Sequence, residues 1–130
     1  MIHLDRSKLR AMGETAAWLL GRRRRIKVTG DSMLPTLTPG DFVLVDPSRS
    51  PAVDDLVLAR HPHEDDLLII KRVASLLDDG RIELASDNEA AGTDSRTWGP
   101  VRAEAIEGVV TLLLDHPGAG TPPPGPETDR

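Results

Sequence analysis

Short apolar runs alternate with turn-forming residues along most of this chain. The runs are rich in Val, Ile and Leu and are too short for helices of ordinary length, which is typical of strands in an antiparallel sheet. Turn signals such as Pro39-Gly40-Asp41 and Asp78-Asp79-Gly80 separate them. Extended structure is also expected to begin within Arg22–Val28. We predict strands at residues 42–45, 56–59, 67–73, 81–85 and 106–114.

The N-terminal stretch has a different period. Its apolar residues recur at roughly helical spacing, which predicts a short helix over residues 4–20 that ends at Gly21. Residues 116–130 are rich in Pro and Gly and lack apolar anchors, so we expect a disordered tail. The predicted fold is mainly β: a compact antiparallel β domain over residues 26–115, preceded by a helix and basic segment over residues 1–25.

Composition limits the classes of function. The chain has 130 residues, enough for one domain, and no cysteine, which excludes disulfides and thiolate nucleophiles. Its net charge of −5 divides into +6 over residues 1–30 and −11 over the remainder. The acidic body argues against nucleic acid as a partner. The apolar stretch Thr15–Leu20 is too short to cross a bilayer, and no signal-peptide pattern is present, so we expect a cytoplasmic protein.

The segment TGDSMLPTL, residues 29–37, presents Ser32 in a turn shaped by Gly30 and Pro35. A serine nucleophile needs a base, and none of the four histidines has a suitable setting. His61 and His63 lie in an acidic loop where solvent exposure is expected, and no spaced set of ligands accompanies them. The sequence therefore indicates neither a metal site nor a cofactor.

Lys71 is a better candidate for the base. In the predicted strand 67–73 it shares a face with Ile69 and Val73, because side chains alternate along a strand. Burial among aliphatic residues lowers the pKa of a lysine, and a neutral lysine can activate a serine. The alternative is that Lys71 extends to solvent at a sheet edge. A structured loop with an Asp94–Arg96 ion pair is expected between residues 86 and 100.

Three segments in order resemble the signal peptidase I family of serine–lysine proteases: GDSMLPTLTPGD (30–41), IIKRV (69–73) and SDNEAAGTDSRTWGPV (86–101). The resemblance covers about residues 26–114 and implies a signal peptidase/LexA-like catalytic core. It makes Ser32 the nucleophile and Lys71 the general base. It places Gly30, Asp31 and Met33 in the oxyanion or substrate region. Structural support is implied for Pro35, Asp94, Ser95 and Arg96, with Asp87 nearby.

Two positions depart from the family pattern. Gly30 stands where some members have a serine whose hydroxyl joins the oxyanion hole, so another donor is expected. Gly92 stands where many members have a serine that hydrogen-bonds the lysine, which leaves the partner of Lys71 open.

The compact form and the third segment resemble the nickel-type superoxide dismutase maturation proteases, a branch of the same family. That branch implies a soluble precursor protein as substrate, from which an N-terminal prosegment is removed. One alternative is a signal peptidase held at the membrane surface through Arg22–Arg25. A LexA-type self-cleaving repressor is disfavoured because too few residues precede Ser32 for a DNA-binding domain. A non-catalytic binding module of the same fold is the third alternative.

Overall fold

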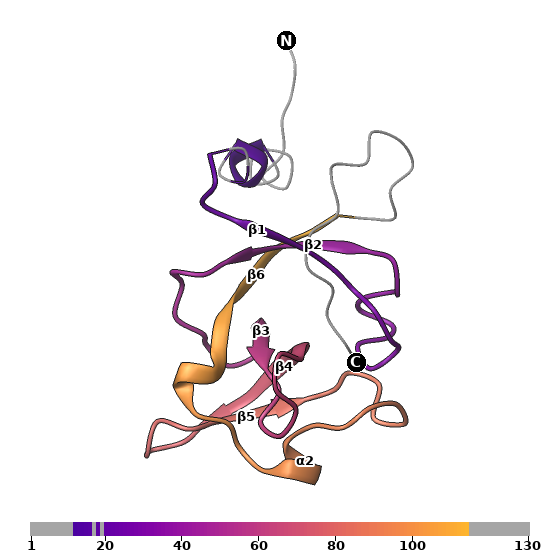
Figure 1. Cartoon of the computed structure of the whole chain (residues 1–130), viewed down its shortest axis with the longest axis vertical. Coiled ribbons are helices and arrows are strands. Elements are labelled where there is room, and N and C mark those ends of the chain that lie inside the picture. The colour runs from indigo at the N-terminus through magenta and orange to yellow at the C-terminus, as the bar shows by residue number, and fades with distance from the viewer. Residues whose placement is uncertain (1–11, 17, 19, 115–130) are drawn as a thin grey trace.

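One six-stranded antiparallel sheet forms the body of the protein (Figure 1). The structure is a computed structural model and describes residues 12–16, 18 and 20–114. The strands are β1 (Arg24–Lys27), β2 (Phe42–Asp46), β3 (Leu56–Arg60), β4 (Leu68–Leu76), β5 (Ile82–Ala85) and β6 (Ile106–Leu114). Between β5 and β6 lie the short helix α2 (Ser95–Trp98) and the 3₁₀ helix η1 (Ala103–Ala105).

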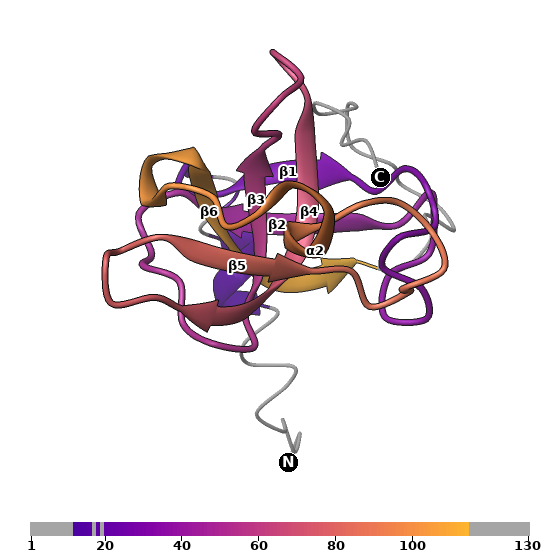
Figure 2. The ribbon, with the colours of Figure 1, turned by 90° about the horizontal axis from the view of Figure 1, so that it is seen from below.

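The strand order is β1-β2-β6-β3-β4-β5, and every neighbouring pair is antiparallel. The register shifts between β2 and β6, between β3 and β6, and between β4 and β5. Such bulges bend a sheet and increase its twist. Figure 1 shows β6 running from the crossing pair β1 and β2 down to the level of β3, β4 and β5, and Figure 2 shows the same strands from below.

The bent sheet encloses two clusters of buried apolar side chains. The first cluster joins β1 and β2 to Met33 and Leu37 in the loop between them, and includes Ile70 of β4. The second cluster joins β3, β4, β5 and β6 and includes Ile69 and Val73. Strand β4 therefore contributes to both clusters from its two faces.

The predicted fold class is confirmed: the protein is mainly β and its sheet is antiparallel. The strand over residues 106–114 has the predicted bounds, and the other predicted strands differ by one to three residues at their ends. Residues 12–16 and 18 are helical, in agreement with the predicted helix, whereas residues 4–11 and the predicted disordered tail lie outside the described residues. The sequence did not predict α2 or η1.

The basic segment after the helix contacts the fold more closely than a solvated run of arginines would. Arg23 forms an ion pair with Glu14 of the helix at 2.6 Å and lies 3.5 Å from Asp46 of β2. Arg25 is buried, and its guanidinium lies 4.4 Å from the centre of the Phe42 ring. Two of the four arginines on which the alternative of membrane contact depends are thus engaged within the protein.

Candidate active site

Ser32 lies in the loop that connects β1 to β2. The loop is closed at its base by hydrogen bonds between Val28 N–H and the Asp41 carbonyl, at 2.8 Å, and between Gly40 N–H and the Val28 carbonyl, at 2.9 Å. Gly30 has a φ of 75°, a conformation that favours glycine. Met33 and Leu37 anchor the loop in the first core cluster. Ser32 itself is only 3% exposed.

Lys71 lies on β4 and is completely buried. Its neighbours on the same face, Ile69 and Val73, are also fully buried, which confirms the predicted placement of a lysine on an apolar face. The alternative of a lysine extending to solvent is therefore wrong. The amine of Lys71 donates a hydrogen bond to the hydroxyl of Ser86, with 2.9 Å between Nζ and Oγ.

The segment Ser86–Asn88 connects the lysine strand to the serine loop. Ser86 contacts Lys71, and the backbone N–H of Asn88 donates to the carbonyl of Ser32 at 2.8 Å. Two residues span at most about 7 Å of chain. The backbone of Ser32 and the amine of Lys71 are therefore both held at the same short segment.

Asp87, between these two residues, makes a second connection. Both of its carboxylate oxygens accept hydrogen bonds from Arg72, each at 2.8 Å, and one also accepts from the hydroxyl of Thr36. The hydrogen bonds from Arg72, opposed by burial and reinforced by Thr36, lower the pKa of Asp87. The Asp87 carboxylate thus ties the residue after Lys71 to the serine loop through charge-assisted bonds.

Asp94 supports this segment from behind. It is 1% exposed and accepts a hydrogen bond from the Ser86 N–H at 2.8 Å. Burial alone would raise the pKa of Asp94, but hydrogen bonds from Arg96 and from backbone N–H groups outweigh it, and the pKa is lowered. The predicted Asp94–Arg96 ion pair is present at 3.0 Å. Ser95 accepts a hydrogen bond from the Leu84 N–H on β5.

The remaining predicted residues divide between surface and core. Asp31 is exposed, and its carbonyl accepts a hydrogen bond from the side chain of Asn88 at 3.1 Å. Pro35 is exposed on the serine loop. Met33, predicted to line a substrate cleft, is 2% exposed and packs in the first core cluster instead of forming an exposed wall.

The sequence reasoning missed the residue that contacts the lysine. The family pattern pointed to position 92, which is glycine in this chain. In the structure the residue that contacts the Lys71 amine is Ser86. A signal was available in the hairpin register. Arg72 pairs with Ala85 across β4 and β5, so the next antiparallel pair brings Ser86 opposite Lys71. Asn88 and Thr36 were also missed as contacts between the segments.

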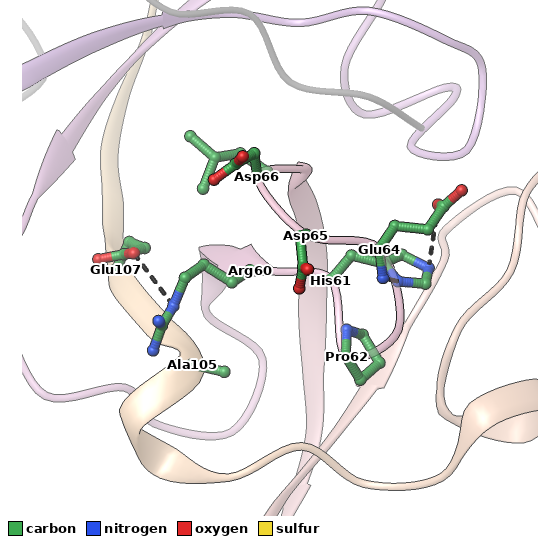
Figure 3. Close-up of a pocket in the computed structure, with 9 residues that line it drawn as sticks. Arg60, His61, Pro62, Glu64, Asp65, Asp66, Ala105 and Glu107 are labelled. Atoms are coloured by element: carbon green, nitrogen blue, oxygen red, sulfur yellow. Dashed lines mark hydrogen bonds and ion pairs between the residues drawn. The ribbon is translucent and has the colours of Figure 1, made fainter.

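A pocket of about 620 Å³ lies beside the β3–β4 hairpin (Figure 3). Arg60 forms an ion pair with Glu107 across one side of it, and His61 faces Glu64 on the other. The backbone N–H groups of His63 and Glu64 donate to Nδ1 of His61, so this imidazole caps the hairpin turn. Neither Ser32 nor Lys71 lines the pocket, which is therefore separate from the candidate active site.

Comparison with known proteins adds the family. A model of the family described as Peptidase S24-like matches residues 21–110. This protein belongs to the Peptidase S24-like family. The match covers strands β1 to β5 and the first five residues of β6, together with Ser32, Lys71 and the segment Ser86–Asn88.

Two relatives of this S24-like peptidase carry more specific names. "Mitochondrial inner membrane protease subunit 1" of Schizosaccharomyces pombe is 32% identical over 113 residues, covering 68% of this chain and 72% of the relative. "Mitochondrial ATP-independent inner membrane protease subunit 1a" of Arabidopsis thaliana is 32% identical over 116 residues, covering 69% of each chain. The described residues contain no helical segment with both the length and the apolar character that spanning a bilayer requires.

Proposed function

We propose that this protein is a serine endopeptidase in which Ser32 is the nucleophile and Lys71 is the general base. The observation that carries the proposal is the buried amine of Lys71, which donates a hydrogen bond to Ser86. Two residues further along the chain, Asn88 contacts the backbone of Ser32. Membership of a peptidase family supports the reaction class. Full burial removes water from the amine, which favours the neutral form that a base requires.

In the acylation step, the hydroxyl oxygen of Ser32 attacks the carbonyl carbon of the scissile peptide bond. The proton of that hydroxyl passes to the neutral amine of Lys71, and a tetrahedral oxyanion forms. The lysine ammonium then donates the proton to the leaving nitrogen, the carbon–nitrogen bond breaks, and an acyl-enzyme remains. Lys71, neutral again, takes a proton from the water molecule that attacks the ester. As the ester bond breaks, the ammonium returns this proton to the departing oxygen of Ser32, which regenerates the serine hydroxyl and the neutral amine.

The hydrogen bond to Ser86 gives the base its direction. A lysine side chain has four flexible carbons, and a free amine would sample many positions. Ser86 is itself fixed by its backbone hydrogen bond to Asp94. Asp94 therefore acts on the base indirectly, by holding the serine that holds the amine.

An extended substrate has an open strand edge beside the base. Strand β4 pairs with β5 only from Arg72 onward, so in the described part of the chain residues 68–70 have no β-strand partner on that side. An added peptide strand there would hydrogen-bond to the backbone and carry its scissile bond toward Ser32.

For the substrate, we propose the precursor of a nickel-type superoxide dismutase, from which an N-terminal prosegment is removed in the cytoplasm. The support is the resemblance of residues 86–96 to the third segment of that branch of maturation proteases. The enzyme would recognise a soluble precursor protein and would need no cofactor of its own.

A second candidate is a signal peptidase that acts on secretory precursors at a membrane. The names of the two relatives, both inner membrane proteases, favour it. Arg22 is exposed and Arg24 is partly exposed, so both side chains could contact anionic lipid.

Intact mass spectrometry tests these candidates together. The dismutase precursor and a secretory precursor are each incubated with the protein and with its Ser32→Ala variant, with and without vesicles containing anionic lipid. Release of a discrete N-terminal segment from the dismutase precursor by the unmodified protein alone supports the proposal. If only the secretory precursor is cleaved, and only when vesicles are present, the result supports the signal peptidase and not the dismutase maturation protease. Equal cleavage by Ser32→Ala overturns the assignment of the nucleophile.

A further inference from the structure

Asn88 contacts both peptide groups that flank Ser32. Its side-chain Nδ2 donates to the carbonyl of Asp31 at 3.1 Å, and its backbone N–H donates to the carbonyl of Ser32 at 2.8 Å. The first carbonyl belongs to the peptide before Ser32 and the second to the peptide after it. One residue thus restricts both backbone dihedral angles of the candidate nucleophile, and the Leu34 N–H, which donates to the same Asp31 carbonyl at 3.2 Å, also restrains the first of these peptides.

The geometry of a trans peptide determines what the first contact does. The carbonyl of Asp31 and the N–H of Ser32 belong to one planar unit and point in opposite directions. Because Asn88 lies on the carbonyl side, the Ser32 N–H is directed away from Asn88. Among the hydrogen bonds of the described residues, none uses this N–H as donor.

We propose that Asn88 is a positioning residue that directs the Ser32 N–H into the oxyanion hole and strengthens it as a donor. The inference rests on the proposed function, because only a peptidase acting through Ser32 forms the oxyanion. A hydrogen bond accepted by a peptide carbonyl polarises the whole peptide unit, so its N–H becomes a better donor. Asn88 does not itself reach the oxyanion, which forms on the opposite side of the peptide.

The orientation of the Ser32 N–H matters more in this chain than in family members where a serine hydroxyl at the position of Gly30 also binds the oxyanion. Residue 30 is glycine and provides no side-chain donor, so the backbone N–H of Ser32 carries a larger share of the oxyanion charge. A misdirected peptide plane would weaken that contact in the transition state while leaving the binding of an extended substrate elsewhere unchanged. The side chain of Asn88 is therefore expected to affect kcat more than KM.

The test uses Asn88→Ala and Asn88→Asp, since both remove the Nδ2 donor and both retain the backbone N–H. Glu89→Ala is the matched control, because Glu89 is the next residue, is exposed, and forms only a 3.6 Å ion pair with the exposed Arg96. Each protein is assayed for kcat and KM on one peptide substrate and for its melting temperature. Inhibition is measured with the matching peptide aldehyde, which forms a tetrahedral adduct on serine, and with the peptide alcohol, which does not.

We expect both Asn88 variants to lower kcat about tenfold or more, below the 10²–10³ reported for losing a direct donor. Aldehyde inhibition weakens by a similar factor, while KM, alcohol inhibition and the melting temperature remain close to those of Glu89→Ala. Unchanged kcat and aldehyde inhibition overturn the inference and leave the proposed function intact. A parallel loss of alcohol binding and melting temperature also overturns it, because that pattern indicates a purely structural role. No turnover by the unmodified protein overturns the proposed function and the inference with it.

Discussion

The amine of Lys71 and the hydroxyl of Ser86 lie 2.9 Å apart on neighbouring segments of one β hairpin. Lys71 comes one residue before Arg72, and Ser86 comes one residue after the strand partner of Arg72, Ala85. The hairpin register alone therefore brings the two side chains together. This arrangement explains how the chain positions a lysine although Gly92 occupies the position where the family pattern has a serine.

Replacing Ser86 tests this arrangement. Ser86→Ala removes the oxygen that holds the amine but leaves the backbone hydrogen bond to Asp94. We predict a fall in kcat of about 10–100-fold, because a base misplaced by about 1 Å loses efficiency on that scale. Steady-state kinetics on a peptide substrate measures it, together with the melting temperature.

Ser75→Ala is the matched control for Ser86→Ala. Ser75 donates a hydrogen bond to Glu83 across the same two strands, at the end away from the site. It should lower neither kcat nor KM. A full kcat in Ser86→Ala, or an equal loss in Ser75→Ala, would show that the hydroxyl of Ser86 does not position the base.

The Arg72–Asp87 contact predicts a dependence of stability on pH. Hydrogen bonds from Arg72 lower the pKa of Asp87 in the folded state, so the carboxylate favours folding above the unfolded pKa of about 3.9. This contribution is lost as pH falls through the lower folded pKa. We predict that Asp87→Asn loses about 1–2 kcal/mol of stability at pH 7, and that its difference from the unmodified protein shrinks below about pH 4.

Denaturant unfolding between pH 2.5 and pH 7 measures this difference, and Asp79→Asn is its control. Asp79 accepts a hydrogen bond from the Arg81 backbone N–H, which the oxygen of asparagine can also accept. Its ion pair with the Arg81 side chain is about half exposed and screened by water, so Asp79→Asn should change stability little at either pH. A constant difference between Asp87→Asn and the unmodified protein across the whole range would contradict the assigned role of the carboxylate.

Replacing Arg25 is predicted to raise the stability of the protein, whereas replacing Asp87 is predicted to lower it. Its two terminal nitrogens are buried and have no hydrogen-bond partner among the described residues, and burial lowers its pKa. The contact with Phe42 offsets only part of this cost. Arg25→Met should therefore raise the stability by about 1 kcal/mol, or about 4 °C in melting temperature. Arg23→Met, which removes the ion pair with Glu14, should lower it. Thermal unfolding decides, and a destabilised Arg25→Met would indicate that the guanidinium has a partner in solution.

The fold was predictable because each strand is bounded by local signals. The apolar runs end at Gly, Pro and Asp residues, and their alternation correctly placed Lys71 on the face of Ile69 and Val73. Strand ends were less accurate because the bulges shift the register. The bulge between Val73 and Ser75, for example, depends on pairing with β5 and not on local sequence.

For the candidate site, the sequence offered mainly the residues that lie within family motifs. Ser32, Lys71 and the Asp94–Arg96 pair lie within such motifs. The contact of Ser86 with Lys71 follows from the register of the β4–β5 hairpin, which the bulge makes hard to predict from sequence. The contacts of Asn88 depend on how this hairpin meets the distant serine loop, and no periodicity of the chain encodes that meeting. For Met33 the motif was misleading. Its place beside Ser32 suggested that it lines a cleft, but the turn directs its side chain into the core.

The most direct test of the central claim is covalent labelling of Ser32. The protein, Lys71→Met and Ser32→Ala are each treated with a fluorophosphonate, which reacts with an activated serine, and the adduct is located by peptide mass spectrometry. Lys71→Met should fold, because methionine suits the buried apolar site that Lys71 occupies. We predict rapid labelling at Ser32 in the unmodified protein and loss of that labelling in both variants. Equal labelling of Ser32 in a folded Lys71→Met, or no labelling of Ser32 in the unmodified protein, would contradict the serine–lysine mechanism.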